Sequence, residues 1–227
     1  MRHLLSYIAF LSLTLGIQAA RDPMRLTHGP MLGNPTSDSV RVWGRTSDPG
    51  EFSVRYGTVE GKPDQTSQPT TTTISNDNTG YATLQNLEPD QTYHYQIYIK
   101  DRPHGLPGSF LTLPSAEHTR NPEHNPKGLF NFRFQIGSCA NQNPIHGNGH
   151  RAKTYENLNR DWAHKTNFHI MNGDWLYEEL REYPVEAWRL RAGIDNLPPV
   201  VNLMPTVVGV WENYKLYLSR GISLSQW

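Results

Sequence analysis

The 227-residue sequence contains a single cysteine, Cys139, so a fold held together by internal disulfide bridges is excluded. An excess of charge of one sign is also lacking. Lysine plus arginine and aspartate plus glutamate number 21 each, which gives no support to a nucleic-acid partner. No internal repeat is visible, and 18 glycines with 17 prolines argue against helical repeats and coiled coils.

Long apolar runs are absent except for residues 4–17, which Arg2 and His3 precede and small residues follow. This layout predicts a secretory signal over residues 1–20, and its core is short for a membrane span. A non-cleaved anchor is the alternative. We expect a secreted, periplasmic or cell-surface protein that does not enter the membrane after cleavage. The lone cysteine is then either a thiol with a role or a small buried apolar residue.

Residues 22–115 show the pattern of an all-β domain. Polar and apolar residues alternate, and turn signals such as Asp48-Pro49-Gly50 separate the alternating segments. No catalytic set gathers in this region, because its histidines His28, His94 and His104 are far apart in sequence and are expected at surface or turn positions. The strands that we expect are 40–44, 52–56, 70–74, 81–84 and 93–99.

The segment from Leu87 through Pro89 to Tyr93 places a tyrosine at the start of a strand, just after a proline corner. Such a tyrosine can return its hydroxyl to the upstream backbone, which is the tyrosine corner of β-sandwich domains. The segment resembles the L-x-P-x-x-x-Y signature of fibronectin type III domains. The resemblance implies a fibronectin III-like sandwich.

Residues 116–128 are polar and proline-containing, which predicts a linker to a second domain at 129–227. There the pattern changes to strand, helix, strand, which favours parallel pairing and an α/β domain. A further helix is expected to start near Pro184. The expected elements are strand 132–137, helix 151–164, strand 168–172 and strand 206–210.

Three potential metal ligands follow the first two strands of this domain. Cys139 ends one strand, Asp174 follows the next within a Gly-Asp pair, and Tyr177 comes three residues later. Carboxyl ends of neighbouring parallel strands share one edge of a sheet, where ligands collect. Thiolate, carboxylate and phenolate suit a transition metal better than Mg²⁺. Gly-Asp is also an ordinary turn, and Glu178 and Glu179 are expected to be solvated.

Three motifs in order look like the alkaline phosphatase D family of metallophosphoesterases. They are Ile136-Gly137-Ser138-Cys139-Ala140, the stretch from Met171 to Glu178, and the stretch from Met204 to Trp211, and the opening from His28 to Thr46 is similar to that family's N-terminal domain. The sandwich is also similar to that of purple acid phosphatases. The resemblance implies export, hydrolysis of phosphate mono- or diesters, and a centre of iron and calcium with Cys139, Asp174 and Tyr177 as ligands.

The chain departs from the family after Trp211, where Glu212, Asn213 and Tyr214 stand in place of two acids and a histidine. The later motifs of the family do not follow, so we expect a C-terminally truncated, weakly active or inactive domain that holds the first β-α-β portion of the fold. One alternative is a non-catalytic secreted sandwich that binds a surface partner or glycan. Another is half of a split enzyme that a second chain completes.

Overall fold

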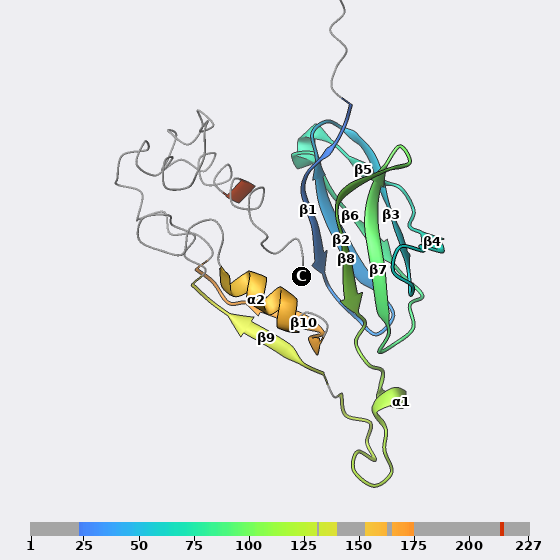
Figure 1. The fold of residues 1–227 in the computed structure, drawn as a ribbon. Coiled ribbons are helices and arrows are strands. Elements are labelled where there is room, and N and C mark those ends of the chain that lie inside the picture. Colours follow the sequence, from blue (N-terminus) through green and yellow to red (C-terminus); the bar gives the residue numbers. More distant parts are fainter. Residues whose placement is uncertain (1–22, 131, 140–152, 163–164, 175–213, 216–227) are drawn as a thin grey trace, which may run out of the picture.

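The structure, a computed structural model, describes residues 23–130, 132–139, 153–162, 165–174 and 214–215 (Figure 1). Two antiparallel sheets form its first part, and a parallel pair of strands with one helix forms its second. Among the described helices, none combines the length and the apolar content that a membrane span needs.

Four of the predictions fall outside the described residues. They are the signal segment 1–20, the helix near Pro184, the strand 206–210 and the position of Tyr177.

The first part is a sandwich of a three-stranded and a five-stranded sheet. In the three-stranded sheet the order is β1 (Leu26–Gly33), β2 (Val40–Thr46) and β6 (Thr79–Leu84). The five-stranded sheet holds β4 (Gln65–Thr66), β3 (Gly50–Gly57), β7 (Thr92–Ile99) and β8 (Arg102–Leu111) in that order, with β5 (Thr70–Thr72) also paired to β3. The strand predicted at 70–74 is shorter in the structure, because a 3₁₀ turn, η1 (Ile74–Asn76), begins at its last residue.

Alternation along the strands puts apolar side chains from both sheets into one core. The residues between them face outward, as expected for antiparallel sheets with one wet face. The predicted all-β fold is confirmed. The buried apolar residues are Val40, Val42, Phe52, Val54, Tyr56, Ala82, Leu84, Leu87, Tyr93, Tyr95, Ile97 and Ile99.

The predicted tyrosine corner is present. The Glu88 backbone N–H donates to the hydroxyl of Tyr93 at 3.0 Å. Thr112, which is fully buried, donates its hydroxyl to the carbonyl of Glu88 at 2.7 Å and accepts from the N–H of Gln91 at 2.9 Å. These bonds satisfy the buried backbone of the corner and tie it to the chain that follows β8.

Strand β8 was not predicted from the sequence, because Pro103, Pro107 and two glycines interrupt its pattern. The structure accommodates them with a register shift opposite the middle of β7. Gln96 of β7 spans this shift, since its Nε2 donates to the carbonyls of His104 at 2.6 Å and Gly105 at 3.1 Å. The side chain thus replaces ladder bonds that the irregular strand cannot make.

The segment between the two parts contains a one-turn helix, α1 (Ala116–Thr119), which the side chain of Ser115 caps by accepting from the N–H of His118. The second part holds β9 (Phe134–Gly137), α2 (Lys153–Trp162) and β10 (Phe168–Met171), which lie beside the sandwich in Figure 1. β9 and β10 pair in parallel, as predicted.

Candidate metal centre

The parallel register of β9 and β10 brings the carboxyl ends of both strands to the same edge. Phe168 lies opposite Phe134, and the pairing runs to Met171 opposite Gly137. One residue further, the N–H of Asn172 donates to the carbonyl of Gly137 at 2.7 Å. The backbones therefore stay together up to the two loops that carry the predicted ligands.

Beyond this last bond, Cys139 and Asp174 meet. The thiol of Cys139 donates to Oδ2 of Asp174 at 2.8 Å, and both side chains are exposed. The two residues are 35 positions apart in sequence, so the β-α-β connection alone produces this contact. Tyr177, the third predicted ligand, lies outside the described residues.

The backbone at both positions adopts a conformation that most residues avoid. Cys139 has a φ of 57° and Asp174 a φ of 50°, both in the left-handed region, and Gly173 between the strand and Asp174 has a φ of 86°. A left-handed conformation at a non-glycine residue costs about 1–3 kcal/mol and persists where the surroundings impose it, often at functional sites. Here it turns both side chains back toward the shared edge.

The chemistry of the two side chains fits a cation. Thiolate sulfur and carboxylate oxygen are both anionic donors, and a metal replaces the thiol proton when it binds. Once that proton is lost, the sulfur of Cys139 and Oδ2 of Asp174 would both be able to contact the same ion. Among the described residues no group of three or more His, Cys, Asp or Glu side chains could hold a metal. The residues thus offer two donors of a site, and their role as ligands stays a prediction.

Sequence reasoning assigned no role to Ser138, whose Oγ lies 3.4 Å from the sulfur of Cys139. The hydroxyl can orient the thiol or, after its proton is lost, donate to the thiolate. The sequence could have indicated this role, because Ser138 directly precedes the cysteine at the end of a strand.

A second polar cluster lies on the sandwich. His28 is buried, so its predicted surface position was wrong. Its Nε2 lies 3.0 Å from the carbonyl of Lys215 and its Nδ1 lies 2.9 Å from the hydroxyl of Thr27. Asp77 nearby is paired with Arg45 at 2.9 Å and with Lys215 at 2.8 Å. Burial, and then the charge of Arg45, lower the pKa of His28, so the ring is neutral at pH 7.

Comparison with known families finds one match, which covers most of the sandwich. The family described as PhoD-like phosphatase, N-terminal domain, matches residues 12–114. No curated protein sequence matches the chain.

Two solved structures are similar to this chain. The structure of PhoD matches with a TM-score of 0.51 and 20% identity, over 66% of this chain and 27% of that chain. Purple acid phosphatase PPD1 from seeds of yellow lupin (Lupinus luteus) matches with a TM-score of 0.39 and 13% identity, over 71% of this chain and 36% of that one. At this identity the match to PhoD concerns the fold, and this chain spans about a quarter of the PhoD chain.

Proposed function

We propose that this chain is part of an exported, metal-dependent phosphatase or phosphodiesterase, because the family of PhoD-like phosphatase N-terminal domains matches residues 12–114. The observation that carries the proposal is the 2.8 Å contact between the thiol of Cys139 and the carboxylate of Asp174 at the ends of two parallel strands. In sheets of this kind, reaction centres are built at the carboxyl ends of the strands.

In this proposal Cys139, Asp174 and Tyr177 hold iron, with calcium as a further ion. A cation bound there would act as a Lewis acid toward a phosphoryl oxygen of the ester. Asp174 accepts the thiol hydrogen bond and so fixes the direction of the sulfur before a metal enters. The hydroxyl of Ser138 lies 3.4 Å from the same sulfur and can donate to the thiolate.

Hydrolysis of p-nitrophenyl phosphate and of the bis-ester at alkaline pH, with ferric and calcium ions supplied, tests the proposal on the full chain. We expect slow hydrolysis that stops when a chelator is added. Cys139→Ala and Asp174→Asn should each lower the rate about tenfold or more, in line with the loss of a group that holds or orients a metal.

Glu117→Gln is the matched control, because it removes an exposed carboxylate of α1 and should leave the rate unchanged. Added ferric ion should also produce a visible absorption band that Tyr177→Phe or Cys139→Ala abolishes. Metal-dependent hydrolysis that survives both Cys139→Ala and Asp174→Asn would refute the assigned ligands.

The second candidate is a non-catalytic secreted binding module, in which only the sandwich acts. A groove on its five-stranded sheet favours this candidate. It predicts that no ester is hydrolysed with any added metal, while the sandwich still binds its partner.

A further inference from the structure

A groove of about 480 Å³ lies at the end of the sandwich where β1 begins and where β7 turns into β8 (Figure 1). Two segments far apart in sequence line it, residues 23–25 before β1 and residues 99–104 of the β7–β8 hairpin. None of the described residues that line it belongs to the second part. β8 runs from the groove for ten residues, about 30 Å, to the chain that leads to the second part.

Every polar side chain among the described residues that line this groove is basic. They are Arg25, Lys100, Arg102 and His104. The first three are exposed, and none of the three takes part in an ion pair within the part of the chain that the structure describes. A cleft lined by charges of one sign concentrates ions of the opposite sign. The groove should therefore attract an anion.

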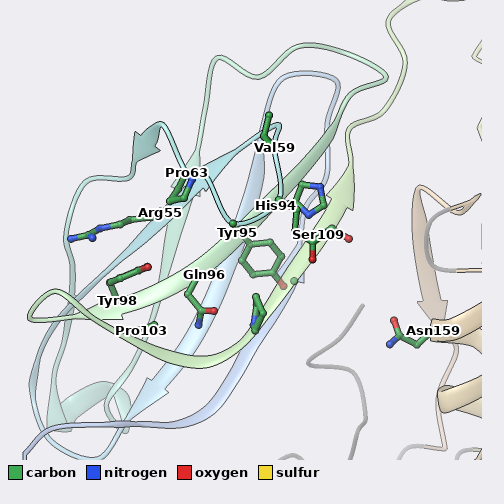
Figure 2. A pocket seen from close by; sticks show the side chains of 14 residues that line it. Arg55, Val59, Pro63, His94, Tyr95, Gln96, Tyr98, Pro103, Ser109 and Asn159 are labelled. Carbon is green, nitrogen blue, oxygen red and sulfur yellow. The ribbon is translucent and has the colours of Figure 1, made fainter.

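The one acid of the hairpin turn is paired elsewhere. Asp101 stands between Lys100 and Arg102 in sequence, but its carboxylate is ion-paired with Arg55 and does not line the groove. The guanidinium of Arg55 lies 4.1 Å from the centroid of the Tyr98 ring, and Figure 2 shows these two side chains beside each other on the five-stranded sheet. Asp101 thus balances Arg55, and the cations of the groove keep their charge.

The backbone holds both segments of the groove in place. Lys100 and Asp101 form the two-residue loop of the hairpin, and their φ angles of 48° and 62° lie in the left-handed region that such loops require. Lysine is an unusual residue there, because a left-handed conformation costs a non-glycine residue stability. In the other segment, the N–H of Arg25 donates to Oγ of Ser47 at 3.1 Å, and its carbonyl accepts from the N–H of Ser47 at 2.9 Å.

We propose that this groove binds the phosphate group of an anionic ligand. Arg25 and Arg102 each present a planar fork that can donate two hydrogen bonds to phosphate oxygens. Lys100 adds a point charge, and His104 adds an imidazole N–H. A terminal phosphate carries about two negative charges at pH 7, so it balances the cations better than a carboxylate with one charge. The proposal does not depend on phosphatase activity, because neither Cys139 nor its partner carboxylate lines the groove.

Isothermal titration calorimetry of the full chain with inorganic pyrophosphate, at low salt and with a chelator present, tests the proposal. We expect binding that weakens as sodium chloride is added, since salt screens exposed charges. Arg25→Gln and Arg102→Gln should each weaken it about tenfold, as expected for the loss of hydrogen bonds from a charged group. Neither should lower the melting temperature, because neither arginine has an ion-pair partner to lose among the described residues.

Arg120→Gln is the matched control, because it removes the charge of an exposed arginine outside the groove and should leave binding unchanged. Cys139→Ala should also leave it unchanged, which separates this groove from the proposed metal centre. Cosedimentation with phosphatidylcholine vesicles, with and without phosphatidic acid, distinguishes the two sources of a terminal phosphate. Capture that needs phosphatidic acid and is lost in Arg102→Gln would assign a lipid headgroup, whereas binding of pyrophosphate alone would assign a soluble phosphate.

Binding of neither pyrophosphate nor vesicles that contain phosphatidic acid would overturn the proposal. Equal weakening by Arg102→Gln and Arg120→Gln would do the same, because the net charge of the chain and not the groove would then explain the attraction. Loss of pyrophosphate binding in Cys139→Ala would also overturn it, since the phosphate would then bind at the other site.

Discussion

At the scale of single residues, Asp77 has the most strongly perturbed carboxylate of the described sandwich. It accepts from Nε and Nη2 of Arg45 at 3.2 and 2.9 Å and is paired with Lys215 at 2.8 Å. These hydrogen bonds, those of Arg45 foremost, lower its pKa from 3.8 to about 2. The side chain is 51% exposed, so solvent screens the pairs and their net contribution to stability is small.

Replacing Asp77 by Asn removes the charge and keeps a residue that tolerates the φ of 52° found there. The lowered pKa means that the carboxylate stabilises the fold above about pH 4 and loses this effect as the pH falls from 3.8 to about 2. We expect Asp77→Asn to lower the free energy of unfolding by less than about 1 kcal/mol at pH 7.

Urea unfolding of both proteins as a function of pH measures this difference, which should shrink to zero toward pH 2. Glu117→Gln serves as the control for loss of an exposed carboxylate and should show no such dependence. A difference that stays constant from pH 7 to pH 2 would mean that Asp77 acts through its shape and not its charge.

At the scale of elements, alternation in the sequence predicted β2, β3 and β7, because buried and exposed positions follow one another strictly there. Alternation failed to predict β8, whose prolines and glycines interrupt the regular pairing. There Gln96 of the neighbouring strand donates to two carbonyls of β8. That compensation comes from another strand, so no local pattern could have revealed it. The burial of His28 was missed for a similar reason, since its acceptor is 187 residues away.

The candidate site could be predicted in part. Cys139 and Asp174 could be placed at one edge because each follows an apolar strand and parallel strands align their ends. Their contact distance could not, because it depends on left-handed backbone conformations at both residues.

Tyr93 tests how much the corner contributes to the sandwich. Tyr93→Phe removes the acceptor of the Glu88 N–H, whose donor atom is partly buried. We expect a loss of about 0.5–1.5 kcal/mol in the free energy of unfolding, the usual net value of one hydrogen bond. Tyr81→Phe, at an exposed position of β6, is the matched control. Equal effects in the two variants would show that the corner bond adds nothing.

At the scale of the whole molecule, the two parts differ in how well they bury their apolar residues. The sandwich has a continuous core, whereas Phe134 is 50% and Ile136 65% exposed on β9. Phe132, Phe134 and Phe168 form an aromatic cluster with centroids 5.5–6.0 Å apart. Parallel strands are normally covered on both faces, so we predict that this exposed face is weakly protected from proteases and prone to aggregation.

Limited digestion with chymotrypsin measures this contrast. Cleavage should begin after the exposed phenylalanines of residues 129–139. A fragment that contains the sandwich should persist, because the backbone of its strands is hydrogen-bonded within two sheets and becomes accessible to a protease only on global unfolding. Mass spectrometry of the time course identifies the fragments. If both parts resisted equally, the second part would be as stable as the first.

The bond between His28 and the carbonyl of Lys215 also has a consequence for the newly made protein. The two residues are 187 positions apart, and ribosomes add about 5–20 residues per second, so the partner is synthesised roughly 10–40 s after the histidine. All the strands of the sandwich are available within that interval. A sandwich that closes during that interval has solvent at this imidazole until Lys215 has been made.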